Sequence, residues 1–372
     1  MAVSEPIQTI SRLTPLADVL VVVDAEVKAV TQRTIDVTAG AGRALAADVI
    51  APARPASPLA LQDGWALSAD ETLGAGGYTP VSLVRPPSRV EAGQALPAGT
   101  DSVAPLDAVK VVDGRAEALA AINPGEGVLV AGGDNDSAIP LRRAGERLRA
   151  TDLAAFAAAG VARIMVREPR IRVLPVRGSG IISAAARLVT NDIERRGGIA
   201  RLDDSGRGLD VAMAADNWDA IVAIGWTGSG RNDNSVQILA REGSLRVHGM
   251  GLAPGESAAF GFVGARPVLL LPGRLDAALS VWLLIGRRML DRLSAAKNDN
   301  ELMETLPLAR KVASTVGLAE VVPVRRNAGQ VEPLATKYLP LSSLARSDGW
   351  IFVPAESEGY SSGSSVQVRP WP

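Results

Sequence analysis

The stretch that most constrains the fold of this chain is an apolar run, 220–224, that leads into a glycine-rich loop, 225–233, and then into a helical pattern. Such a run is typical of a short buried strand of an α/β sheet. Glycines let backbone N–H groups approach a phosphate, and the next helix would present its positive end there. The same glycines could equally serve plain turns, so ligand binding and a structural loop both stay open.

Strand and helix patterns alternate between residues 168 and 293, which predicts a mostly parallel sheet with crossover helices. An open sheet binds ligands at the carboxyl ends of its strands. The expected strands are 171–176, 198–202, 220–224 and 267–271, and the expected helices are 181–196, 209–215, 235–241 and 275–293. The expected strand ends carry 177–180, Asp203-Asp204, 225–233 and 272–274.

The flanking segments have other patterns. Residues 11–33 show helical spacing of leucine and valine, and 151–159 form a further expected helix. Short strand-like runs fill 34–120 and the segment after a polar linker at 297–301. We therefore expect a multidomain α/β fold: a three-layer α/β domain with a mostly parallel sheet, an N-terminal helix plus β lobe, and a C-terminal small β-barrel. The expected boundaries are 1–55 with 121–167 for an N-terminal scaffold, 56–120 for an inserted β lobe, 168–296 for the α/β domain and 302–372 for the C-terminal domain.

Composition narrows the chemistry. With no cysteine, the chain lacks the residues for disulfides, thiolate nucleophiles and cysteine zinc sites. Its single histidine, His248, nearly excludes a histidine-rich metal site or a Ser-His-Asp triad. The 39 basic and 40 acidic residues balance, so we expect neither a nucleic acid nor a membrane partner. The first residues do not resemble a secretion signal and no apolar run is long enough to span a bilayer, which favours a cytoplasmic protein.

Several short motifs in a shared order resemble the molybdopterin molybdenumtransferase family, which includes the MoeA proteins and the E-domain of gephyrin. The resemblance runs from about residue 10 to the C-terminus. The matching phrases are 62–66 for M-D-G-Y-A, 93–101 for T-G-A-x-x-P-x-G-A-D, 132–134 for G-E-D, 141–148 for L-L-x-x-G-x-x-L, Asp203-Asp204 for a D-D pair, 225–233 for G-G-V-S-V-G-x-x-D, Pro254-Gly255 for K-P-G-K-P and 271–273 for L-P-G-N-P-V-S.

The resemblance implies a molybdopterin-binding α/β domain. A family member binds adenylylated molybdopterin and molybdate, inserts the metal with the help of Mg²⁺ and releases AMP, typically as a homodimer. The resemblance implies catalytic roles for Asp63, Asp134, Asp203 and Asp233, with Asp63 and Asp233 as metal ligands, because Mg²⁺ prefers carboxylate and phosphate oxygens. It implies cofactor-binding roles for Gly225, Gly228, Ser229, Gly230, Arg231, Pro272, Gly273 and Arg274. Each aspartate could instead be a turn or cap residue beside glycine.

The departures from the family pattern fall where the chemistry should be. Ala92 replaces a threonine, the segment 176–181 lacks two acidic residues, and Trp226 and Gly228 replace a glycine and a serine in the loop. An indole at position 226 could stack on a flat pterin or fill the pocket, and the pattern favours filling. Gly249, Ala253 and Glu256 stand where the family has lysines, which weakens pyrophosphate binding. Arg177, Arg231 and Arg274 could restore the positive charge, or could be solvated surface residues.

Two functions follow from this pattern. The first is molybdenum insertion into adenylylated molybdopterin within molybdenum cofactor biosynthesis. The second is a non-catalytic binding or scaffold protein with the same fold, which carries the cofactor or serves other molybdenum-cofactor proteins. An unrelated nucleotide enzyme fits less well, because the aspartates follow the order of the molybdenum family.

Overall fold

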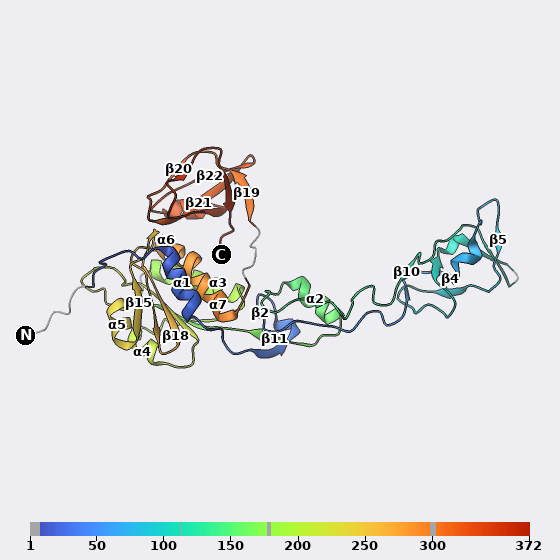
Figure 1. The fold of residues 1–372 in the computed structure, drawn as a ribbon, viewed down its shortest axis with the longest axis horizontal. Helices are drawn as coiled ribbons and strands as arrows, with labels where there is room; N and C mark the ends of the chain where they lie inside the picture. Colours follow the sequence, from blue (N-terminus) through green and yellow to red (C-terminus); the bar gives the residue numbers. More distant parts are fainter. Residues whose placement is uncertain (1–7, 113, 177–179, 298–302) are drawn as a thin grey trace, which may run out of the picture. The chain divides into compact units, whose positions relative to one another are not determined.

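The computed structural model describes residues 8–112, 114–176, 180–297 and 303–372. The chain forms two compact units (Figure 1). The main unit contains Met1–Ala47, Ala144–Ala150 and Arg163–Pro372, and the inserted unit contains Asp48–Arg143 and Thr151–Ala162. This division into two units does not test the expected domain boundaries, which remain a proposal.

A six-stranded sheet forms the centre of the main unit, in the order β13-β12-β14-β18-β17-β15. The first four of these strands are parallel, and the last two join antiparallel. Their bounds are Arg170–Pro175 for β12, Ile199–Leu202 for β13, Ala220–Ile224 for β14, Ser244–His248 for β15, Ala259–Val263 for β17 and Arg266–Leu271 for β18.

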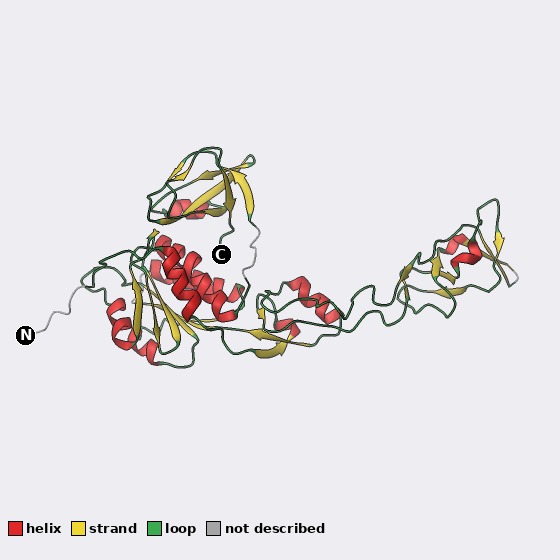
Figure 2. Cartoon of the chain, viewed as in Figure 1, coloured by secondary structure: helices red, strands yellow, loops and turns green. Residues whose placement is uncertain are grey.

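Helices cover both faces of this sheet and complete three layers (Figure 2). In β14 the alternation of a strand sends Val222 and Ile224 into one core and Ile221 and Ala223 into the other. The helices on the first face are α1 (Leu16–Glu26), α3 (Gly180–Arg195), α6 (Leu275–Val281) and α7 (Arg287–Ser294), and those on the second are α4 (Leu209–Ala214) and α5 (Ser235–Glu242).

These elements confirm the expected parallel strands and crossover helices to within a few residues. The N-terminal helix expected over 11–33 is shorter than predicted and spans only Leu16–Glu26. The antiparallel pair β15 and β17 was not predicted, because its short runs follow one another without a helix between them. Most of the expected linker, 298–301, lies outside the described residues.

The long helix expected over 275–293 contains a π-helical turn, Trp282–Gly286, between α6 and α7. Trp282 is fully buried, and its Nε1 donates to Asp192 over 2.7 Å. A Cβ on Gly286 would lie 2.1 Å from Cε3 of this indole, so only glycine fits at that position.

Gly286→Ala is therefore expected to destabilise the main unit by about 1–3 kcal/mol, despite the higher helix propensity of alanine, because the indole has no room to move. Urea unfolding followed by circular dichroism would measure this. Gly180→Ala in α3 is the control, since a Cβ there meets nothing within 4 Å. Equal unfolding midpoints for the two variants would contradict the packing argument.

The C-terminal residues form a small β domain around one apolar core. It joins the rest of the main unit through the short strand β16 (Leu252–Ala253), which pairs in parallel with β21. Its other elements are β19 (Glu304–Pro307), β20 (Val312–Ala313), β21 (Ala319–Asn327), β22 (Gln330–Pro333), α8 (Leu341–Arg346), β23 (Gly349–Val353), β24 (Gly359–Tyr360) and β25 (Ser365–Val368).

The remaining described strands are short. The inserted unit holds small antiparallel sheets and most of α2 (Ala150–Ala158). Its strands are β3 (Leu59–Ala60), β4 (Gly64–Leu67), β5 (Val81–Ser82), β6 (Ser88–Val90), β7 (Ser102–Ala104), β8 (Val109–Val112), β9 (Arg115–Ala118) and β10 (Val128–Leu129). A separate sheet of the main unit contains β1 (Arg33–Asp36), β2 (Ala44–Leu45) and β11 (Arg163–Arg167).

Candidate functional site

The glycine-rich loop 225–233 leaves the carboxyl end of β14, as expected. Gly225 has a φ of 110°, which glycine adopts without strain, and its N–H donates to the Leu271 carbonyl over 2.8 Å. Gly273 lies against it, since a Cβ on Gly273 would be 3.6 Å from the Gly225 Cα. The structure thus brings together the ends of β14 and β18, which carry the predicted residues Gly225, Pro272 and Gly273.

The carboxylate of Asp233 lies inside its own loop. The Gly230 N–H donates to Asp233 Oδ2 over 3.2 Å, and the Asp233 N–H donates to the Gly230 carbonyl over 3.0 Å. A Cβ on Gly228 would be 2.9 Å from the same Oδ2. A carboxylate therefore already occupies the concave side of the loop, where the sequence pattern predicted a phosphate. Ser229 and Arg231 are exposed at the tip.

The amides at the start of α5 are also engaged within the chain. The Ser235 N–H donates to the Trp226 carbonyl over 3.2 Å, and the Val236 N–H donates to Gln8 Oε1 over 3.3 Å. The Gln8 amide is buried and donates to the carbonyls of Trp226, over 2.9 Å, and Gly228, over 2.6 Å. Gln8 thus fixes the loop, a role that no sequence motif indicated.

Trp226 adopts a φ of 61°, a left-handed conformation that costs a non-glycine residue about 1–2 kcal/mol. The loop therefore keeps a backbone suited to the glycine of the family pattern. The half-buried indole packs against the core on the α4 and α5 side. Trp226 also lines a cavity of about 300 Å³.

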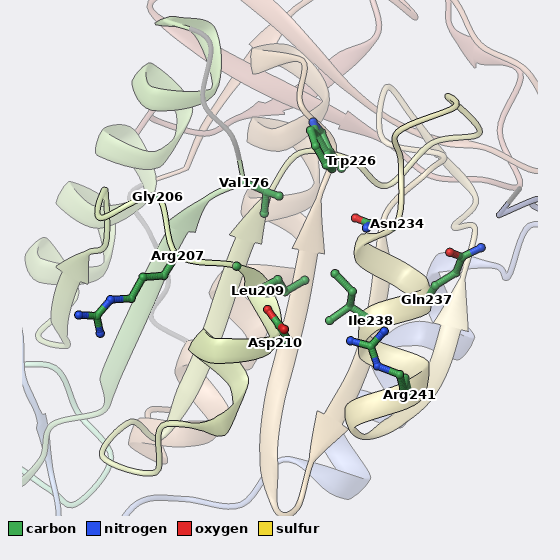
Figure 3. A pocket seen from close by; sticks show the side chains of 11 residues that line it. Val176, Gly206, Arg207, Leu209, Asp210, Trp226, Asn234, Gln237, Ile238 and Arg241 are labelled. Carbon is green, nitrogen blue, oxygen red and sulfur yellow. The ribbon is translucent and has the colours of Figure 1, made fainter. Parts of the chain in front are cut away.

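We call this space the loop cavity. Besides Trp226 its lining includes Arg207, Asp210, Asn234, Gln237 and Arg241 (Figure 3). Asn234, Gln237 and Arg241 come from α5 and its N-terminal edge, and Asp210 from the first turn of α4. In Figure 3 the Arg207 side chain points away from Asp210 and α5. The loop cavity thus combines an aromatic wall, a carboxylate, two amides and the Arg241 guanidinium.

Asp203, at the end of β13, is bound to its own sheet. Arg172 donates to Asp203 Oδ2 through Nε over 2.8 Å and also through Nη2, and the Ser205 N–H donates to Oδ1 over 3.2 Å. Burial alone raises the pKa of Asp203, but the hydrogen bonds from Ser205 and Arg172 outweigh it and lower the pKa below its ordinary value of 3.8.

Asp203→Asn is expected to lower the free energy of unfolding by about 1–2 kcal/mol at pH 7. A depressed folded-state pKa contributes stability that is present above the unfolded value of 3.8 and is lost as the pH falls through the folded value. The difference between wild type and variant should therefore shrink below pH 4. Denaturant unfolding at pH 7 and pH 3 checks this, and a difference independent of pH would refute it.

Arg274, in the loop after β18, pairs with Asp276 rather than pointing freely into the site. Its Nε lies 3.1 Å from Asp276 Oδ1, and its guanidinium lies 4.8 Å from the centre of the Tyr338 ring. The hydrogen bond to Asp276 is the main reason that the pKa of Arg274 is raised. The Leu339 N–H donates to Asp276 Oδ2 over 3.1 Å, so this loop is held against the C-terminal β domain.

Asp63 and Asp134 belong to the inserted unit. Asp63 Oδ1 accepts a hydrogen bond from the Ala92 N–H over 2.9 Å, so it supports the turn that contains Ala92 and Gly93. Asp134 is exposed, and its N–H donates to the Arg54 carbonyl over 2.9 Å. Arg177 lies outside the described residues.

Comparison with known protein families identifies the family of this chain. A model of the MoeA N-terminal region, domains I and II, matches residues 2–160, and a model of the MoeA C-terminal region, domain IV, matches residues 305–371. The chain belongs to the MoeA family. It is 26% identical to a Methanocaldococcus jannaschii protein assigned to molybdopterin biosynthesis, over 90% of this chain and 91% of that protein.

Solved MoeA structures share the fold. A molybdopterin biosynthesis MoeA protein from Pyrococcus horikoshii OT3 has a TM-score of 0.77 and 20% identity, with 97% of this chain and 100% of that chain covered. A molybdenum cofactor biosynthesis protein from Pyrococcus furiosus has a TM-score of 0.61 at 20% identity and the same coverage. The expected multidomain α/β fold is thereby confirmed. Among the described helices none is long and apolar enough to span a membrane.

The structure leaves little room for the family's lysines. Gly249 has a φ of 88°, and a Cβ on it would lie 2.5 Å from Ile10 Cγ2 and 2.8 Å from the Arg12 carbonyl oxygen. Ala253 is buried. Glu256 is exposed and accepts a hydrogen bond from the Gly255 N–H over 3.0 Å. A lysine at position 249 would therefore require the N-terminal segment to move.

Two of the aspartates for which the family resemblance implies catalytic roles are engaged within the main unit. Asp203 is neutralised by Arg172, and Asp233 accepts from its own loop. Within the ranges that the structure describes, no three histidine, cysteine, aspartate or glutamate side chains gather into a possible metal site.

Proposed function

We propose that this MoeA-family chain, a protein of molybdenum cofactor biosynthesis, binds a molybdopterin-type ligand in the loop cavity without inserting the metal. One observation carries the proposal. The glycine loop holds its own carboxylate, Asp233, while an open cavity with an aromatic wall remains beside it. The ligand therefore occupies the loop cavity, and the glycine loop positions the cavity wall.

The chemistry of the loop cavity suits a pterin. A flat ring can stack on the Trp226 indole, in the manner that bases stack on aromatic side chains. The amino and ring N–H groups of a pterin donate hydrogen bonds, for which the Asp210 carboxylate is the matching acceptor. Arg241, whose Nε pairs with Glu242 over 2.8 Å, supplies a cation for the phosphate of the ligand. A volume of about 300 Å³ is within the lower range of small-ligand sites.

The insertion reaction lacks the same support. Asp203 and Asp233 are engaged within the chain, and Gly249 and Ala253 replace lysines at positions where a long side chain meets packed atoms. A carrier or scaffold role, in which a cytoplasmic homodimer holds the ligand for other molybdenum-cofactor proteins, needs none of these groups. Magnesium and adenylylated molybdopterin turnover belong to the alternative, the active transferase.

Calorimetric titration with molybdopterin under anaerobic conditions tests the binding site. Asp210→Asn should weaken binding about tenfold, because it removes the charge from an acceptor of two hydrogen bonds. Asp204→Asn is the matched control, since Asp204 is exposed and does not line the loop cavity. Equal affinities for the two variants, or no binding to the wild type, would overturn the proposal.

A further inference from the structure

The first described residues of the chain, 8–14, form an irregular segment that joins the glycine loop to the residues after β15. We call it the N-terminal strap. At one end the Thr14 N–H donates to the Gly249 carbonyl over 2.9 Å. At the other end the Gln8 side chain is 5% exposed and bonds both the loop and α5. Arg12, between these ends, is exposed. Gln8 is thus the buried anchor of the strap.

The partners of Gln8 fix the orientation of its amide. A side-chain amide has two N–H donors and one carbonyl acceptor. Nε2 donates to the carbonyls of Trp226, over 2.9 Å, and Gly228, over 2.6 Å, while Oε1 accepts from the Val236 N–H over 3.3 Å. A flipped amide would place Oε1 against two carbonyl oxygens and Nε2 against an N–H. Only the observed orientation satisfies all three partners, and it uses both donors on the loop.

These three bonds connect two parts of the loop cavity. Trp226 forms its aromatic wall, and Val236 lies in α5 directly before Gln237, which lines the cavity from that helix (Figure 3). A φ of 61° is unfavourable for a tryptophan, so tertiary bonds must hold the backbone there. The Trp226 carbonyl accepts two such bonds, from Gln8 and from the Ser235 N–H over 3.2 Å. The position of the indole relative to α5 therefore depends on Gln8.

We propose that Gln8 is a positioning residue of the loop cavity, which holds the Trp226 indole where a flat ring can stack on it. Gln8 does not line the cavity itself, so it acts on a ligand through the Trp226 wall. The effect on ligand affinity rests on the proposed function, whereas the effect on the position of the indole does not. The two effects are therefore measured separately.

Tryptophan fluorescence of the full chain without ligand tests the position of the indole. Gln8→Glu keeps the size of the side chain but removes both donors and, at pH 7, places a carboxylate against two carbonyl oxygens. The emission of Trp226 is the difference between each protein and the same protein with Trp226→Phe. Gln8→Glu should move this emission to longer wavelength, because water reaches a displaced indole. Gln330→Glu, at an exposed position of β22, is the control. Thermal unfolding verifies that each variant is folded, and an unchanged Trp226 emission would overturn the proposal.

Calorimetric titration with molybdopterin tests the effect on affinity. Gln8→Glu should weaken binding about tenfold in the wild-type background. In the Trp226→Gly background the same substitution should change the affinity less than about twofold, because the wall through which Gln8 acts is gone. Equal losses in the two backgrounds would overturn the positioning role. No binding to the wild type would refute the proposed function, while the Trp226 emission would still decide whether Gln8 holds the indole in place.

Discussion

Asp192→Ala is expected to lower the free energy of unfolding of the main unit by about 3–5 kcal/mol, because it leaves a buried arginine without its counter-ion. Asp192 and Arg287 are 3% and 9% exposed and meet over 2.8 and 2.9 Å, and Trp282 donates to the same carboxylate. Burial alone raises the pKa of Asp192, but Arg287 and Trp282 outweigh it and keep the pKa below its ordinary value. The carboxylate is therefore charged in the native core.

Urea unfolding at pH 7 measures this loss, and the chain offers a matched control. Asp24 accepts from Arg288 with the same paired geometry, over 2.7 and 2.8 Å, but is 36% exposed. Asp24→Ala should cost no more than about 1 kcal/mol, because exposed ion pairs contribute little. Similar losses for the two variants would show that burial is not the source of the effect.

Trp226→Gly is expected to weaken molybdopterin binding about tenfold or more while changing stability little. Stacking on an aromatic side chain contributes about 1–3 kcal/mol per ring. Two effects on the free energy of unfolding oppose each other. Glycine removes the cost of about 1–2 kcal/mol for the left-handed backbone, while the packing contacts of the half-buried indole are lost.

Trp226→Phe is the control for this experiment, because it keeps an aromatic ring in the same backbone conformation. It should retain most of the affinity. Titration of both variants with molybdopterin, beside denaturant unfolding, gives the two quantities. Tighter binding by Trp226→Gly than by the wild type would mean that the indole fills the ligand position rather than stacking on the ligand.

The local patterns of the sequence predicted the parallel part of the sheet well, because buried runs such as 220–224 and the helices between them carry strong periodicity. The hairpin of β15 and β17 lacks such a signal. β17 joins the sheet by antiparallel pairing with β18, and β15 joins it through β17, and periodicity does not encode such pairing.

The site was harder to predict than the fold. The motif gave the position of the loop 225–233 at a strand end, but not the orientation of Asp233 toward Gly230. Gln8 lies 218 residues from Trp226 in the chain, and a single glutamine carries no motif. The partner of Asp203, Arg172, lies on a neighbouring strand. Each of these contacts depends on tertiary packing, which decides whether a polar residue is free to bind a ligand.

Incubation of the full chain with adenylylated molybdopterin, molybdate and Mg²⁺, with AMP release measured by chromatography, tests the central claim most directly. We expect the chain to bind molybdopterin while AMP release stays at the level of a protein-free sample. A complete member of the family, assayed beside it, verifies the substrates. AMP release by this chain at a rate near that of the complete member would contradict the account and establish an active transferase.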